Sequence, residues 1–112
     1  MSERTEVTAE EAIALVAEGV YLLDVREQHE WDAGHAPAAH LLPMSQLAER
    51  LDEVPDDREV LIVCHLGGRS AQVTSALRGR DFRAVDVLGG MVAWQNAEGE
   101  LTTDSGTEPS VD

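Results

Sequence analysis

The chain has 112 residues, of which 43% are hydrophobic and 27% are charged, and this makeup fits one compact domain with a modest core. Its 22 acidic residues outweigh eight basic ones, all of them arginine, and leave a formal charge of -14. Without lysine the chain cannot use a Walker-type phosphate loop or Schiff-base chemistry, and so acidic a surface argues against nucleic acid and anionic membranes as partners.

The N-terminal part of the chain predicts a helix followed by a buried strand. Thr8 and Glu11 place a hydroxyl and a carboxylate three residues apart, the capping-box pattern, and this predicts a helix over 8–18. The apolar run 20–25 contains one carboxylate, Asp24, near its end, which is typical of a strand buried on both faces of a parallel sheet. Because the first apolar run is too short for a signal peptide or a membrane span, we expect a cytoplasmic protein.

Short elements are predicted next, where apolar runs are brief and turn residues frequent. They are a short helix over 27–32, a turn over 34–37, an extended piece over 39–42, a helix over 45–51 and an acidic loop over 52–57.

The C-terminal part contains the clearest strand and helix. The expected elements are a strand over 59–64, a helix over 70–79, a strand over 84–88 and a helix over 91–97. We expect residues 1–101 to form the domain and residues 102–112 to be a disordered acidic tail, because almost nothing in that tail is apolar. Strands alternating with helices predict an α/β fold with a doubly wound, mainly parallel sheet of about five strands and helices on both faces. Such sheets place their sites beyond the carboxyl ends of the strands.

The segment most indicative of chemistry begins at Cys64, the only cysteine, which stands where a predicted strand ends. The residues between this cysteine and the next helix are His65, Leu66, Gly67, Gly68, Arg69 and Ser70. Two adjacent glycines let successive amides converge, and the helix N-terminus adds the positive end of its dipole, so the segment predicts a cradle for an anion at the sulfur. The stretch 60–80 also lacks any carboxylate. We interpret Cys64 as a reactive nucleophile rather than a small buried apolar residue.

Several motifs in order resemble those of the single-domain rhodaneses, the rhodanese-like sulfurtransferase family, over about residues 8–101. The motifs that carry the resemblance are 22–27, Glu30 with 34–39, the loop 64–70 and the terminal segment 88–94. The second motif departs from the family pattern twice, with Ala36 in place of a large aliphatic residue and Ala38 in place of glycine.

The resemblance implies a sulfurtransferase of the thiosulfate (rhodanese) type. In this chemistry Cys64 takes sulfane sulfur from thiosulfate or a persulfide donor, holds it as a persulfide within the loop amides, and passes it to a thiol or cyanide. The implied partners are a small sulfur-donor anion and a thiol or protein acceptor. No cofactor is implied, and we expect a monomer or weak dimer. Four residues separate Cys64 from Arg69, as in the sulfur-transferring members, whereas the related phosphatases have five. A non-catalytic binding module or sulfur-relay accessory domain, and a phosphatase or arsenate reductase, stay open as alternatives.

Supporting roles are also implied by the resemblance. Arg69 would help to hold the anionic substrate and the loop shape. Asp24 and Arg26 would support the loop through hydrogen bonds and ion pairs, with Glu30 as a partner for Arg26. His35 would be a turn residue that hydrogen-bonds the backbone.

A metal site is not expected. His29, His35 and His40 lie six and five residues apart, so their rings do not share one helical face, and no cysteine or carboxylate pair completes a set. Trp31, in a polar stretch, is a candidate for the rim of the pocket, while the sequence assigns no role to His65.

Overall fold

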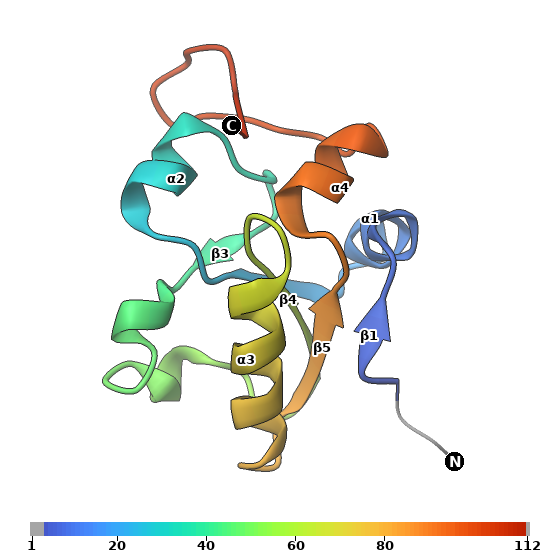
Figure 1. The fold of residues 1–112 in the computed structure, drawn as a ribbon, viewed down its shortest axis with the longest axis vertical. Helices are drawn as coiled ribbons and strands as arrows, with labels where there is room; N and C mark the ends of the chain where they lie inside the picture. The colour runs from blue at the N-terminus through green and yellow to red at the C-terminus, as the bar shows by residue number, and fades with distance from the viewer. Residues whose placement is uncertain (1–3, 112) are drawn as a thin grey trace.

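A five-stranded parallel sheet forms the centre of the protein in this computed structural model, which describes residues 4–111 (Figure 1). The strands are β1 (Glu6–Val7), β2 (Tyr21–Asp24), β3 (His40–Leu41), β4 (Glu59–Val63) and β5 (Arg83–Val87). They lie in the order β1-β5-β4-β2-β3. Strand β4 is therefore central, and the segment that follows it emerges at the middle of the carboxyl edge.

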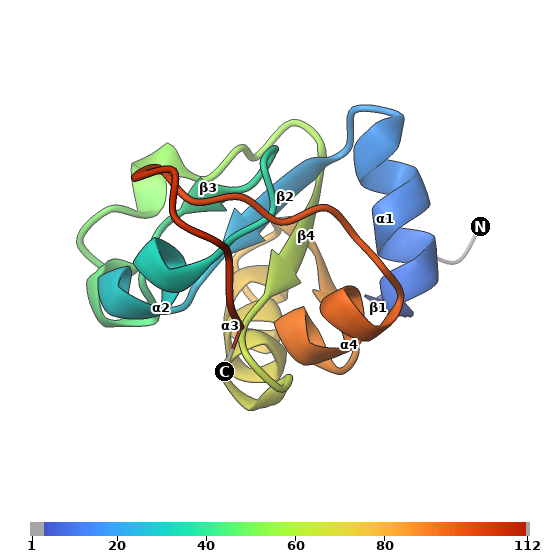
Figure 2. The same cartoon turned by 90° about the horizontal axis from the view of Figure 1, so that it is seen from above.

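Helices cover both faces of this sheet. The α-helices are α1 (Ala9–Ala17), α2 (Gln28–Ala33), α3 (Gly68–Arg78) and α4 (Gly90–Asn96). Side chains of α1 and α4 belong to the core cluster on one face, and those of α3 to the cluster on the other, while α2 lies beyond the carboxyl ends of the strands (Figures 1 and 2). The predicted doubly wound α/β fold is confirmed. Within residues 4–111, none of the helices is long and apolar enough to cross a bilayer.

Strand β4 shows why a continuous apolar run becomes a central strand. Leu61 and Val63 pack into the core on the α1 and α4 side, while Val60 and Ile62 pack on the α3 side, and all four are fully buried. A strand buried on both faces needs no polar alternation, so a continuous apolar run suits this central position.

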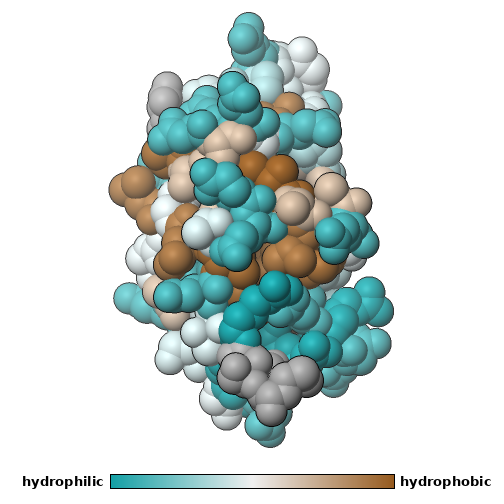
Figure 3. Space-filling model, turned by 90° about the vertical axis from the view of Figure 1, so that its right-hand side faces the viewer, coloured by the Kyte–Doolittle hydropathy of each residue, from teal (hydrophilic) through white to brown (hydrophobic). Residues whose placement is uncertain are grey.

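Helix α1 begins at the predicted capping box. The Glu11 amide donates to Thr8 Oγ1 at 3.1 Å, and the Thr8 amide donates to the Glu11 carboxylate at 2.8 Å. The helix covers its part of the core incompletely, since Ile13 and Val16 are only half-buried. Figure 3 views the molecule from the side on which β1 and α1 lie and shows apolar residues exposed in the middle of that face, with hydrophilic residues above and below.

The expected helix over 45–51 is wrong. Two short 3-10 turns, η1 (Met44–Gln46) and η2 (Leu51–Glu53), take its place. The apolar residues Met44 and Leu51 pack against the same core cluster, and the backbone leaves helical geometry at Arg50, where φ is -121°. Because the segment packs on the core at both Met44 and Leu51, it forms two short turns instead of one continuous helix. Strand β1, which the sequence did not indicate, pairs with β5 through two residues.

The sequence predicts a disordered C-terminal tail, but in the structure residues 102–111 pack against the domain. Thr102 and His35 exchange backbone hydrogen bonds of 3.0 and 2.8 Å, and the Ser110 amide donates to the Ala33 carbonyl at 2.8 Å. Val111 is 3% exposed and joins the core on the α1 and α4 side. Figure 2 shows the segment crossing from α4 to α2 and then folding back. Backbone pairing and one apolar anchor thus order a polar chain, while a domain boundary at residue 101 stays a prediction.

Candidate active site

Cys64 directly follows the central strand, and its sulfur accepts hydrogen bonds from the loop backbone. The Gly67 amide donates to Cys64 Sγ at 3.1 Å and the Ser70 amide at 3.3 Å. Gly67 adopts φ of +120°, a conformation that side chains disfavour, and this lets the chain curl around the sulfur before α3 begins at Gly68. The cradle therefore consists of two N–H groups, one of them in the first turn of α3, aimed at the sulfur.

The start of α4 holds the beginning of this loop. The Met91 amide donates to the Cys64 carbonyl at 2.7 Å, and the Val92 amide donates to the His65 carbonyl at 3.2 Å. Gly90 makes this approach possible, because a Cβ there would lie 2.4 Å from both carbonyl oxygens. The glycine pair of the terminal motif thus packs against the loop that follows β4.

Burial separates the thiol from the loop tip. The Cys64 side chain is 1% exposed and belongs to the core on the α3 side, whereas Leu66 is 66% exposed. The sulfur is enclosed, but polar N–H groups rather than hydrocarbon alone surround it. These N–H groups are placed to donate to whatever sulfur species occupies this position.

Glu30 forms its ion pair with Arg69, the second residue of α3, and not with Arg26. The two terminal nitrogens of Arg69 lie 2.7 and 2.8 Å from the two Glu30 oxygens. These hydrogen bonds lower the pKa of Glu30 to about 2, against the opposing effect of partial burial. The expected pairing of Glu30 with Arg26 is wrong, because α2 turns Glu30 toward the start of α3.

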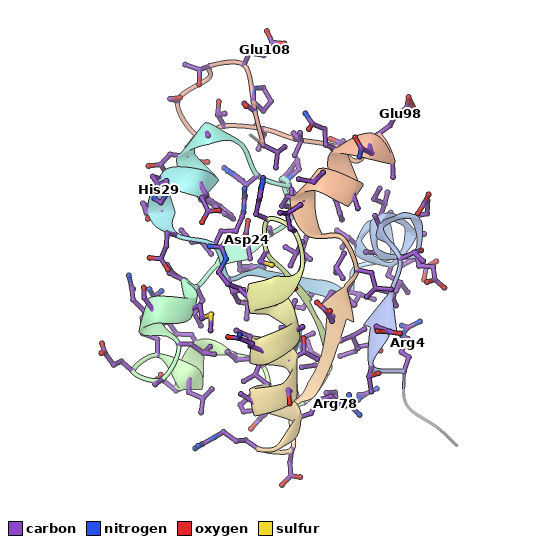
Figure 4. All side chains as sticks on the ribbon, in the orientation of Figure 1. Arg4, Asp24, His29, Arg78, Glu98 and Glu108 are labelled. Atoms are coloured by element: carbon purple, nitrogen blue, oxygen red, sulfur yellow. The ribbon has the colours of Figure 1, made fainter. Side chains whose placement is uncertain are left out.

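Arg26 instead forms a buried ion pair with Asp24, at the end of β2. The Arg26 Nη2 atom lies 2.7 Å from Asp24 Oδ2 and 2.8 Å from the Gly34 carbonyl oxygen. The two side chains are 1% and 0% exposed. In the view of Figure 4, Asp24 lies in the interior between α2 and α3. The Arg26 guanidinium folds back onto Asp24, two residues earlier, and also binds the Gly34 carbonyl oxygen, so the ion pair holds the turn at Gly34. We expected the two residues to support the Cys64 loop by hydrogen bonds, and the structure does not show this.

His35 and Trp31 form a small cluster with the C-terminal segment. The His35 Nδ1 atom lies 3.0 Å from the Trp31 carbonyl oxygen, and the two rings stack with centroids 3.6 Å apart. Asp104 lies 3.3 Å from His35 Nε2 and accepts the Trp31 indole N–H at 3.2 Å. The contacts of both side chains therefore join α2 to residues near the C-terminus.

Asp86, on β5, is the residue that sequence reasoning missed. The Ser70 hydroxyl donates to Asp86 Oδ1 at 2.6 Å, and Cys64 Sγ lies 3.4 Å from the Ser70 hydroxyl oxygen. Asp86 is 8% exposed, and its burial raises the pKa of the carboxyl. The available signal was a lone carboxylate near the end of an apolar strand, the same signal that marked Asp24.

Of the other two histidines in the rejected metal set, His29 lies on α2, and the ring of His40 stacks on Tyr21 at a centroid distance of 4.2 Å. Across residues 4–111, no three His, Cys, Asp or Glu side chains gather closely enough to hold a metal ion. The polar groups around Cys64 are backbone amides, a hydroxyl and a carboxylate, which suit proton and thiolate chemistry.

A parallel α/β domain with a cysteine cradled after its central strand defines a class of protein, and the comparisons with known proteins agree. The family model for the rhodanese-like domain matches residues 8–97. The chain is 38% identical over 78 residues to a sulfurtransferase of Allochromatium vinosum, covering 69% of this chain and 73% of the relative. It is 32% identical over 97 residues to the thiosulfate sulfurtransferase GlpE of Pseudomonas entomophila, covering 86% and 89%.

A solved structure gives the same result. The crystal structure of a rhodanese-related protein from Thermoplasma volcanium superposes with a TM-score of 0.83 at 25% identity, over 89% of this chain and 99% of that one. The chain therefore belongs to the rhodanese-like domain family, and the resemblance found in the sequence is confirmed.

Proposed function

We propose that the protein is a sulfurtransferase of the thiosulfate (rhodanese) type that carries sulfur as a Cys64 persulfide. The observation that carries the proposal is the pair of amides, from Gly67 and Ser70, that donate to Cys64 Sγ. Fixed N–H dipoles of this kind stabilise a thiolate before reaction and a persulfide anion after it.

The proposed reaction has two displacements. Cys64 thiolate attacks the outer sulfur of thiosulfate, the S–S bond breaks, and sulfite leaves with the bonding electron pair. A thiolate or cyanide then attacks the outer sulfur of the persulfide and releases Cys64 as a thiolate. No electron is gained or lost overall. The acceptor leaves as a persulfide or as thiocyanate.

The charge around the loop supports a small anionic donor rather than a phosphate. Arg69 follows Cys64 after four residues, and its guanidinium already binds Glu30 at two points. A guanidinium committed to a carboxylate has less capacity to hold a transferred phosphoryl group in the loop, whereas sulfur transfer leaves only one sulfur atom on Cys64. The partners we propose are therefore a small sulfur-donor anion and a thiol or protein acceptor. We also propose that the protein is cytoplasmic and is a monomer or weak dimer.

A second candidate is a non-catalytic binding module or sulfur-relay accessory domain. The observation that favours it is the burial of Cys64, which is 1% exposed. For the first candidate to hold, the loop must admit a donor to that sulfur.

Intact mass after incubation with thiosulfate separates the two candidates. Wild type should gain one sulfur atom, and cyanide should remove it with release of thiocyanate. Cys64→Ser, which keeps the size of the side chain, should gain nothing. An unchanged wild-type mass with thiosulfate, polysulfide and a low-molecular-weight persulfide would reject the enzyme in favour of the binding module.

A further inference from the structure

We infer that Asp86 is a positioning residue that accepts the Cys64 thiol proton through Ser70 and exchanges it with solvent through a hollow between β1 and α3. The inference deepens the proposed function and rests on it, because a thiolate at Cys64 is the species that attacks the donor. It concerns a carboxylate that the family motifs in this sequence did not mark.

The three side chains form a continuous hydrogen-bonded chain with one polarity. The Cys64 thiol donates to Ser70 Oγ at 3.4 Å, and Ser70 Oγ donates to Asp86 Oδ1 at 2.6 Å. The Ser70 hydroxyl has one proton, and its other acceptor, the Gly67 carbonyl oxygen, lies farther away at 3.2 Å. A hydroxyl bonded to a carboxylate at 2.5–2.7 Å has the short distance of a charge-assisted hydrogen bond. The proton of Ser70 therefore points toward Asp86, and its lone pairs are free to face the thiol.

Burial makes this chain suitable for moving a proton. Cys64, Ser70 and Asp86 are 1%, 0% and 8% exposed. Loss of hydration raises the pKa of Asp86, the hydrogen bond from Ser70 lowers it, and the nearby Glu6 raises it. A carboxylate that has lost hydration is a better base than an exposed one.

The hollow on the other side of Asp86 gives the proton an exit. It has a volume of about 290 Å³ and is lined by Thr5, Glu6, Ala71, Thr74, Ser75, Arg78 and Asp86. The Thr74 hydroxyl oxygen is buried and has no hydrogen-bond partner among the described residues. A polar hollow of this size can hold water, and an unpartnered hydroxyl beside a carboxylate is where a water would bind.

The charged groups that share this region do not replace the relay. Glu6, paired with Asp86 in the β1–β5 register, adds a like charge, and the Arg78 guanidinium donates to the Ala84 carbonyl at 2.9 Å. Arg69 lies near the thiol but binds Glu30. None of these charged groups lies between Ser70 and Cys64 or between Ser70 and Asp86, which are in direct hydrogen-bond contact.

The proton balance is complete without any redox partner. The Cys64 S–H bond breaks as its proton moves to Ser70 Oγ, while the hydroxyl proton of Ser70 moves to the Asp86 carboxylate. The products are a thiolate, an unchanged serine and a neutral carboxylic acid. At mildly acidic pH Asp86 keeps this proton, so thiolate formation releases none to solvent. At higher pH Asp86 releases it to water in the hollow, and the reverse path returns a proton to Cys64.

The test follows alkylation of Cys64 by iodoacetamide as a function of pH, since the chain contains one cysteine. The proteins are wild type, Asp86→Asn, Ser70→Ala and the matched control Asp81→Asn, which removes an exposed carboxylate at the opposite end of β5. In wild type and the control, internal transfer to Asp86 should keep the rate nearly constant across mildly acidic pH. In the other two variants the proton must go directly to solvent, so the rate should fall about tenfold for each pH unit.

The opposite result is equally clear. If Asp86 acted only through its negative charge, Asp86→Asn would form the thiolate more easily and would be alkylated faster than wild type, which would overturn the inference. A wild-type rate that itself falls tenfold per pH unit would also overturn it, even if both variants failed to fold. Thermal unfolding by circular dichroism identifies such a failure. Because alkylation needs no sulfur donor, a flat wild-type profile without sulfur uptake from thiosulfate would reject the proposed function and keep the relay.

Discussion

Arg69 and Glu30 are joined by two hydrogen bonds, 2.7 and 2.8 Å long, although they lie 39 positions apart in the sequence. Arg69 lies in the first turn of α3, directly after the Cys64 loop, and Glu30 lies in α2. The pair therefore connects the loop to a helix at the carboxyl edge of the sheet. It also commits the Arg69 charge to a protein carboxylate.

Glu30→Gln tests this connection. We expect a loss of about 1 kcal/mol in the free energy of unfolding at neutral pH, because the pair is only partly buried and water screens it. Urea unfolding provides the measurement, and Glu49→Gln, which removes an exposed carboxylate elsewhere, is the control. Equal losses in the two variants would show that net charge, rather than the contact with Arg69, determines the effect.

The same pair predicts a pH dependence. The pKa of Glu30 is lowered from 4.5 to about 2, mainly by the hydrogen bonds from Arg69. A carboxyl whose pKa is lower in the folded state contributes stability that is present above its unfolded pKa and is lost as the pH falls through the folded pKa. The advantage of wild type over Glu30→Gln should therefore shrink between pH 4.5 and about 2. A difference that stays constant over this range in urea titrations would contradict the assignment.

Arg26→Met should be among the most destabilising single changes in the chain. It leaves the Asp24 carboxylate buried without its ion-pair partner, and loss of one member of a buried pair costs about 3–5 kcal/mol. Replacing both residues, as Asp24→Leu with Arg26→Met, should recover part of that loss. The matched control is Arg58→Met, because the Arg58–Asp57 pair is 60% and 68% exposed. If chemical denaturation gave the two arginine variants the same midpoint, the buried pair would not have the role described.

Local patterns predicted every strand except β1, most helices and the Cys64 cradle, because the groups concerned are close in the chain. Gly67 and Ser70 lie three and six residues after Cys64, so the sequence of one loop determines that geometry. The contacts that were missed join distant segments, as in Arg69 with Glu30 and Ser70 with Asp86. Which carboxylate meets which donor depends on how the helices pack, and a single sequence does not reveal it.

The C-terminal segment is where the expectation from composition and the structure differ most plainly. Its residues are polar, and polar chains without an apolar face rarely order. Here the order comes from backbone pairing of Thr102 with His35 and from the burial of Val111. Neither feature has a local sequence signature.

Val111→Asp tests whether that segment packs as described. Val111 is 3% exposed in the core, so placing a charge there should cost about 2–3 kcal/mol of stability and release the segment. Limited proteolysis should then cut within residues 102–111 faster than in wild type. Ser105→Asp, which adds the same charge at an exposed position of the same segment, is the control. Cleavage of wild type as fast as of Val111→Asp would instead support a disordered tail.

Gly90→Ala should damage both stability and the loop that holds the sulfur. A Cβ at this position would lie 2.4 Å from the carbonyl oxygens of Cys64 and His65, and Gly90 has φ of +60°. Because the obstruction is backbone, relief requires the loop to move, and we expect a loss of about 2 kcal/mol or more. Gly79→Ala is the matched control, since Gly79 has an ordinary φ of -65° and its Cβ would meet atoms no closer than 3.4 Å. The control should change the unfolding free energy by about 0.5 kcal/mol or less. Gly90→Ala should also slow alkylation of Cys64 at neutral pH, because the displaced Gly67 and Ser70 amides no longer stabilise the thiolate. Wild-type alkylation in a destabilised Gly90→Ala would show that α4 supports the fold without shaping the cradle.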